Sequence, residues 1–157
     1  MISMKRRIFL QGSLAAGVLG AAATAGLLVP RRVLAAWPEK AFDAKQVDEA
    51  LTALMGSTAS QASDKIDIKA PDIAENGAVV PVAVTVDLPG VTSISIIAEK
   101  NPSPLVASFE LASGTEAYVA TRIKMGKTSN VIALVKANGK LYSAKKEVKV
   151  TIGGCGG

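Results

Sequence analysis

The sequence predicts an all-β protein, an antiparallel β-sandwich of about seven strands preceded by one α-helix. From residue 65 onward apolar side chains alternate with polar ones, which is the period of a half-buried strand. Turn residues interrupt this alternation every ~10 to 15 positions, and Asn138-Gly139 is typical of a two-residue hairpin turn. Many short strands separated by regular turns are the pattern of an antiparallel sandwich.

Residues 1–36 have the pattern of an export signal. An arginine pair precedes an aromatic residue and a leucine, namely Arg6, Arg7, Phe9 and Leu10. A weakly apolar run rich in alanine and glycine follows over residues 12–29, and cleavage is expected after Ala35 or Ala36. The alternative is an uncleaved membrane anchor, but alanine and glycine give this run too little hydrophobicity for stable insertion. We therefore expect a twin-arginine signal and a periplasmic protein without stable membrane association after cleavage.

Removing the signal changes the charge balance of the chain. The full sequence has 18 Lys and Arg against 13 Asp and Glu, but five of the basic residues and none of the acidic ones lie in residues 1–36. The other 121 of the 157 residues therefore hold 13 charges of each sign, and they suffice for one domain. With three Phe, two Tyr and one Trp there is no aromatic platform for bases. These features exclude nucleic-acid binding.

One helix is expected within residues 37–56. Asp43 fits the N-cap position, with Gln46 reaching back as in a capping box, and Gly56 fits the end of the helix. Between them lies an apolar stripe that faces either the core or a partner, made of Val47, Ala50, Leu51, Leu54 and Met55. Residues 57–64 are polar and show no periodicity, which predicts a linker.

The sandwich domain is expected over residues 65–152. Its predicted strands, each marked by alternating apolar residues, cover residues 66–68, 80–88, 94–98, 105–109, 119–125, 131–135 and 140–152. Pro81 indicates an edge strand or a bulge. Immunoglobulin-like topology fits such a set of strands, although the cysteines and tryptophan of the antibody core are missing. The basic residues of these strands are expected on wet faces, where a few could assist an anionic substrate.

The only cysteine, Cys155, lies in a glycine-rich stretch, residues 153–157. It is flanked by Gly153, Gly154, Gly156 and Gly157. Glycines offer no side chains to pack against, so we expect an exposed thiol on a flexible arm, with a disordered end or an expression scar as the plain alternative. The chain has no histidine to act as a base or to share a zinc ion, and one cysteine cannot form an intramolecular disulfide. We therefore expect an attachment point that other proteins load, with no metal and no cofactor. An adduct, a mixed disulfide and a homodimer disulfide stay open.

Four stretches of the chain resemble one family. They are AENGAVVPV at 74–82, EKNPSPLVASF at 99–109, TRIKMG at 121–126 and GGCGG at 153–157. Together with the twin-arginine signal, the leading helix and the sandwich, they resemble SoxY, the family of sulfur carrier subunits in bacterial thiosulfate oxidation. The resemblance covers essentially the whole chain.

The resemblance implies a role for Cys155. In this family the terminal cysteine holds the sulfur intermediate covalently: the haem protein SoxAX conjugates thiosulfate to it, SoxB hydrolyses off sulfate, and SoxCD can oxidise the sulfane left behind. The resemblance also implies a heterodimer with SoxZ, which lacks its own signal and travels to the periplasm with its partner. Such a carrier is not itself an enzyme. The alternative class is a structural periplasmic sandwich that dimerises through a Cys155 disulfide.

Overall fold

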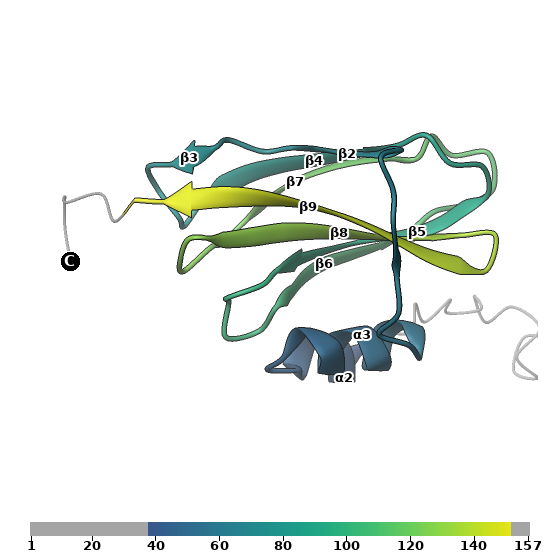
Figure 1. Ribbon diagram of the computed structural model, residues 1–157, viewed down its shortest axis with the longest axis horizontal. Helices are drawn as coiled ribbons and strands as arrows, with labels where there is room; N and C mark the ends of the chain where they lie inside the picture. The colour runs from purple at the N-terminus through teal and green to yellow at the C-terminus, as the bar shows by residue number, and fades with distance from the viewer. Residues whose placement is uncertain (1–37, 152–157) are drawn as a thin grey trace, which may run out of the picture. The chain divides into compact units, whose positions relative to one another are not determined.

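The computed structural model describes residues 38–151, and residues 1–37 and 152–157 lie outside the described part (Figure 1). Its strands are β1 (Gln61–Ala62), β2 (Ile66–Lys69), β3 (Ile73–Ala74), β4 (Val80–Val86), β5 (Val91–Ala98), β6 (Leu105–Glu110), β7 (Tyr118–Ile123), β8 (Ser129–Ala137) and β9 (Lys140–Val150). The larger sheet has the order β1-β9-β8-β5-β6, with β3 also pairing with β9, and the smaller has the order β2-β4-β7. The predicted β-sandwich is confirmed.

The strand order is that of an immunoglobulin-like sandwich. β2, β4 and β7 take the places of strands A, B and E, while β5, β8 and β9 take those of C, F and G. β6 extends the larger sheet beyond β5, and the pairs between these longer strands are antiparallel. The longer strands correspond to those that the sequence predicts.

The main core lies between the two sheets and is built by alternate residues of each strand. On β4 the four valines at even positions are buried, and the odd positions are exposed or half-buried. β8 contributes Val131, Ala133 and Val135 from the larger sheet, and each of them is fully buried. The period of two that predicts strands in the sequence is therefore the period of burial.

Pro81 lies in the central strand of the smaller sheet, and the predicted edge strand at this position is wrong. Asp87 N–H donates to Lys65 O on the β2 side, so the odd positions of β4 direct their N–H groups toward β2. β2 pairs with β4 only as far as Ala83. The nitrogen of Pro81, which carries no hydrogen, therefore faces a position that β2 has already left.

Two helices precede the strands, where one was predicted. α2 spans Glu39–Asp43 and α3 spans Val47–Met55. The predicted N-cap at Asp43 is wrong, because this residue ends α2 and the backbone becomes extended at Ala44. The N-cap of α3 is Gln46, which makes no side-chain cap hydrogen bond. The predicted capping box therefore fails at both of its positions.

The ends of α3 are held by other contacts. The Oε2 atom of Glu49 reaches back and accepts the Lys45 N–H at 3.3 Å. The predicted helix end at Gly56 is confirmed, since this residue adopts a left-handed conformation (φ 74°) and its N–H donates to Thr52 O. No helix within residues 38–151 is long and apolar enough to cross a membrane.

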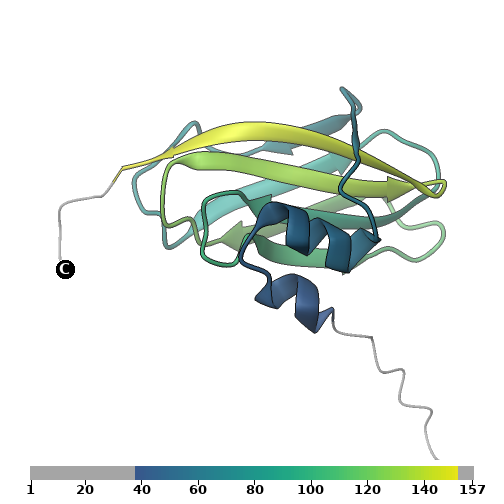
Figure 2. The same cartoon turned by 60° about the horizontal axis from the view of Figure 1, so that its bottom comes forward.

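Both helices lie across the outer face of the larger sheet (Figure 2). Ala50 and Leu51 of α3 form a buried cluster with Ile97 of β5 and Leu134 of β8. β8 is therefore covered by apolar side chains on both of its faces. Four of the five residues of the predicted stripe, Val47, Ala50, Leu51 and Leu54, therefore pack on the chain's own sheet, and the alternative of a partner-facing stripe is wrong for these four.

Residues 57–64, predicted as a linker, contain β1. This strand pairs in parallel with Tyr142 and Ser143 of β9. Ser60 Oγ donates to Ser143 Oγ at 2.9 Å, and Ser63 N–H donates to Ser143 O at 3.0 Å. The sequence does not reveal this strand, because two residues are too few to show an alternation of polar and apolar side chains.

Truncating Leu51 tests whether the helices are part of the core. Leu51→Ala should lower the free energy of unfolding by about 2 to 4 kcal/mol, because it removes buried methyl groups between α3 and the larger sheet. Leu54→Ala, at a half-buried position of the same helix, should cost about 1 kcal/mol. Urea denaturation measures both values. Equally small losses would mean that α3 contributes little to the core.

Candidate functional site

The residues predicted as functional lie outside the described part of the chain. They are Cys155, Gly153, Gly154, Gly156 and Gly157 of the arm, and Arg6, Arg7, Phe9 and Leu10 of the signal. The structure does describe the support of the arm, which is the end of β9. We call residues 149–151 the root. Cys155 follows four residues after Thr151, a span of at most ~14 Å in an extended chain.

β9 is held on both edges close to its end (Figure 1). On one edge it pairs with β8 as far as Val148, which is fully buried. On the other edge β3 adds two parallel pairs, Ile73 with Lys149 and Ala74 with Val150. A strand end that is paired on both edges opens less readily than one with a single neighbour. The root is therefore a fixed point of the fold.

Hydrogen bonds continue this support to Thr151. Val150 N–H donates to Thr128 Oγ1 at 2.9 Å, and Thr151 N–H donates to Ala74 O at 3.1 Å. Thr128 belongs to the connection between β7 and β8, so a second segment holds the root besides β3. The last described residue is thus anchored, four residues before Cys155.

Three connections between strands lie at the same end of the sandwich as the root. They are residues 75–79, 99–104 and 124–128, and we call this end the arm-side end. The Asn101 side chain joins two of the connections, donating to Lys124 O at 2.6 Å and accepting the Gly126 N–H at 3.0 Å. The buried Met125 donates its N–H to Gly77 O at 2.7 Å and so links the third. The surface around the root is therefore cross-linked.

Gly77 lies directly against the root. A Cβ atom at this position would lie 2.8 Å from Val150 Cγ1 and would overlap the carbonyl oxygen of Met125. Only a residue without a side chain fits between these two atoms without a shift of the backbone. Gly77 thus allows the connection after β3 to approach β9 closely.

The described charges at the arm-side end are mainly exposed lysines. They are Lys100, Lys124, Lys127 and Lys149. The same end holds two exposed carboxylates, Glu75 and Glu99, and Glu99 accepts a hydrogen bond from Asn130 Nδ2 at 2.9 Å. A thiol at this end would find exposed cations, which attract anions weakly through water, but no histidine in the chain to take its proton. This arrangement favours an attachment point over a self-contained catalyst.

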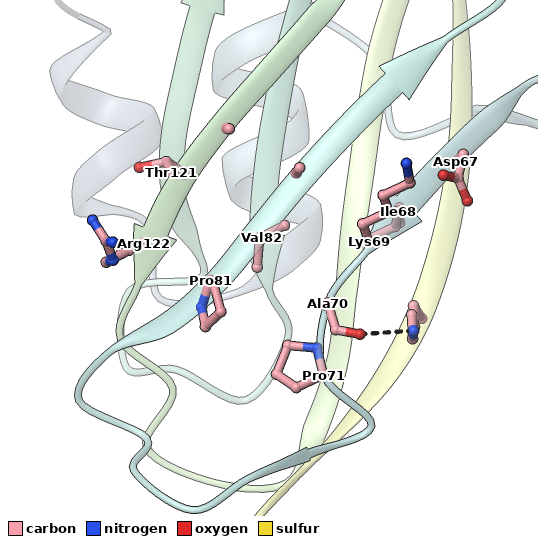
Figure 3. A pocket seen from close by; sticks show the side chains of 12 residues that line it. Asp67, Ile68, Lys69, Ala70, Pro71, Pro81, Val82, Thr121 and Arg122 are labelled. Atoms are coloured by element: carbon pink, nitrogen blue, oxygen red, sulfur yellow. Dashed lines mark hydrogen bonds between the residues drawn. The ribbon is translucent and has the colours of Figure 1, made fainter.

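A shallow groove of about 730 Å³ lies on the smaller sheet, where β2 parts from β4 (Figure 3). Pro71 and Pro81 are among the described residues that line it. Lys146 reaches it from β9, donating to Ala70 O at 2.8 Å and pairing with Asp72 at 3.2 Å. The Asp72 side chain is 88% exposed, so this ion pair contributes little to stability. The groove is explained by the crossing of the chain from β2 to β3, which Lys146 ties to β9.

The residues that hold the root were not predicted. Gly77, Asn101 and Gly126 belong to the stretches AENGAVVPV, EKNPSPLVASF and TRIKMG, which indicated only a family resemblance. Asn-Gly and Asn-Pro steps in two of these stretches are turn signals. Turn signals predict a loop, but they do not show which loops touch each other in space.

Adding one methyl group at Gly77 should disturb the root. Gly77→Ala should lower the free energy of unfolding by about 1 to 3 kcal/mol, because the new Cβ must displace Val150 or the carbonyl of Met125. Gly126→Ala is the matched control, since its Cβ would lie 3.9 Å from Asn101 Oδ1 and should cost less than about 0.5 kcal/mol. Thermal unfolding compares the two variants. Equal losses would show that Gly77 is not tightly packed.

Comparison with known proteins identifies a family with the same sequence pattern and fold. The family model for "Sulfur oxidation protein SoxY" matches residues 51–155. Among solved structures, the sulfur carrier protein SoxY from Chlorobium limicola f thiosulfatophilum is 51% identical at a TM-score of 0.63, and the match covers 73% of this chain and 99% of that chain. No curated protein sequence gives a match.

A second solved structure is similar in fold alone. Superoxide reductase (neelaredoxin) from Ignicoccus hospitalis is 20% identical at a TM-score of 0.52, and the match covers 59% of this chain and 95% of that chain. The SoxY structure, by contrast, also shares 51% sequence identity with this chain. Because the family match also spans most of the sequence, this chain belongs to the SoxY family of sulfur carrier proteins.

Proposed function

We propose that this chain carries intermediates of thiosulfate oxidation covalently on Cys155, in the periplasm. The observation that carries the proposal is the extent of the family match, which runs from residue 51 through Cys155 and so includes the cysteine as well as the sandwich. The anchored root supports it, because it holds the chain in place four residues before the thiol.

The proposed cycle begins at the Cys155 thiolate. Its sulfur forms a bond with the sulfane sulfur of thiosulfate, and the two electrons released by this oxidation pass to the haem protein SoxAX. SoxB then uses water to break the bond to the sulfonate group, which leaves as sulfate, and one extra sulfur stays on Cys155 as a persulfide. SoxCD can oxidise this remaining sulfur. Once it is loaded, the carrier keeps the substrate sulfur covalently bonded to Cys155 between the enzymes.

In this cycle the carrier supplies attachment and the partner enzymes supply activation. A free thiol has a pKa near ~8.5, so only a small fraction is thiolate at neutral pH. The chain has no histidine that could raise this fraction by acting as a base. The glycines beside Cys155 add no side-chain bulk, which suits a thiol that must enter several different active sites. The chain is therefore proposed to be a substrate of enzymes and not an enzyme.

We also propose a heterodimer with SoxZ. The apolar stripe of α3 already packs on the chain's own sheet, so the pairing would use sheet edges or the uncovered face of the smaller sheet. Residues 37–157 have equal numbers of basic and acidic residues. The pairing is therefore expected to rest on apolar contact and to persist in moderate salt.

Replacing Cys155 tests the attachment. Cys155→Ser keeps the size of the side chain and removes the nucleophile, so thiosulfate-dependent respiration should stop in cells that carry the variant. The free energy of unfolding should change by less than about 0.5 kcal/mol, because the neighbouring glycines offer no side chains for residue 155 to pack against. Respiration on thiosulfate and thermal unfolding are the two measurements. A variant that still oxidises thiosulfate would contradict the proposal.

Mass spectrometry separates the carrier from the alternative of a structural dimer. Intact protein from cells grown with thiosulfate should carry sulfur adducts on the peptide that contains Cys155. A structural protein would show only a disulfide between two copies. The same spectrum would show whether the first residue of the mature chain is Ala36 or Trp37.

Changing the arginine pair tests the route of export. With Arg6 and Arg7 both replaced by lysine, this chain and SoxZ should both stay in the cytoplasm, because the proposed pair folds and assembles before transport. Cell fractionation followed by immunoblotting of both proteins measures this. SoxZ reaching the periplasm without the signal would rule out export as a pair.

A further inference from the structure

We propose that Ile73 and Val79, at the arm-side end close to the root, form the surface that receives the rim of an enzyme's cleft when the arm enters it. We call these two side chains the root collar. The inference rests on the proposed carrier function, and it adds the surface that the processing enzymes recognise. The partner is defined by its chemistry, as a protein with an apolar rim around a cleft that takes up the arm.

The root collar stands out by exposure. Within residues 38–151 three large hydrophobic side chains are exposed, namely Ile73 (58%), Val79 (52%) and Tyr118 (47%). Two of them lie at the arm-side end, and Tyr118 starts β7 at the opposite end of the sandwich. One exposed apolar side chain needs no explanation, but two at the end of the sandwich that carries the root are the start of an apolar contact surface.

Both residues of the root collar lie close to the root. Ile73 is the register partner of Lys149, so the two side chains share one face of the larger sheet. Val79 is two residues from Gly77, which lies against Val150. Ile73 lies two residues before the connection that packs on the root, and Val79 is the last residue of that connection.

The short chain between the root and Cys155 requires a processing enzyme to approach the root collar. Cys155 can reach at most ~14 Å beyond Thr151. Active sites that exclude water lie inside clefts, so the thiol must travel part of that distance below the enzyme surface. The mouth of the cleft must then come close to Thr151 and its surroundings. Every enzyme that processes sulfur on Cys155 would meet the same surface.

The fold itself does not require the exposed methyl groups of Ile73 and Val79. Both are β-branched, which favours the extended backbone at and beside a strand, but this preference requires no exposed methyl groups. Threonine keeps the branched shape and replaces one methyl or ethyl group by a hydroxyl. Ile73→Thr and Val79→Thr therefore remove apolar contact while they keep the backbone preference.

The test uses full-length mature protein paired with SoxZ and loaded without any enzyme. Tetrathionate loads the thiol directly, since the Cys155 thiolate attacks one of its central sulfurs, a new sulfur–sulfur bond forms, and thiosulfate leaves with the electron pair of the broken bond. The loaded carrier is then the substrate of SoxB, and sulfate release is followed as a function of carrier concentration. Mass spectrometry confirms equal loading of all variants.

Each single substitution should raise KM for the loaded carrier about fivefold, and the pair should raise it more than tenfold, with kcat unchanged. Unchanged kcat is expected because the root collar contacts the rim and not the reacting sulfur. Tyr118→Thr is the matched control, because this large hydrophobic residue is also about half exposed but lies at the far end, and it should leave both constants unchanged.

The possible outcomes separate this inference from the proposed function. If SoxB releases no sulfate from loaded wild-type carrier, the carrier function itself is wrong. If wild type is processed and the double variant has the same KM, the root collar is not a docking surface. If the double variant instead fails to pair with SoxZ in size-exclusion chromatography, these residues belong to the heterodimer interface and the inference is overturned. A raised KM with intact pairing supports it.

Discussion

The parallel pairing of β3 with the last residues of β9 is the contact on which the arm-side end depends. β3 reaches β9 because the chain leaves the smaller sheet after Lys69 and crosses to the larger one. The same crossing opens the groove beside β4 and leaves a vacant edge position at which Pro81 needs no hydrogen bond. One change of sheet therefore explains the proline, the groove and the support of the root. An ordinary edge strand in the place of β2 would leave the end of β9 with a single neighbour.

The helices add a second constraint, because they occupy the outer face of the larger sheet. Among the described residues, partners are left with the outer face of the smaller sheet, the sheet edges and the arm-side end. In the proposed function SoxZ stays bound while several enzymes bind in turn, so they could not all use one surface. The arm-side end would have to stay accessible for the thiol to be processed, and the proposed SoxZ partner would then bind elsewhere. Because the α3 stripe packs on the larger sheet, the proposed heterodimer has fewer surfaces available for its interface.

The sequence predicted the strands that are long enough to show an alternation of apolar and polar residues, and it missed the two-residue strands. Seven strands were found because each shows the alternation of a half-buried strand, and Gly56 was found because a left-handed helix end strongly favours glycine. β1 and β3 were missed because each has two residues, and their existence depends on β9, far away in the chain. Asp43 is a good N-cap by residue type, but the helix that begins after Pro38 includes it.

For the candidate site, composition alone singled out Cys155. Thr128 and Gly77, which support the root, are recognised only by their contacts in space.

The distance from the root to the cysteine connects the fold to the proposed chemistry. A thiol tethered four residues from a fixed point searches a small volume, so its effective concentration inside a docked cleft is set by the position of the root. A loose root would enlarge that volume and lower the fraction of encounters in which sulfur reaches the reacting groups. The chain has no histidine that could recover this loss by acting as a base. In the proposed function, pairing on both edges of β9, the Thr128 hydrogen bond and the close approach of Gly77 would matter because they limit where Cys155 can present sulfur.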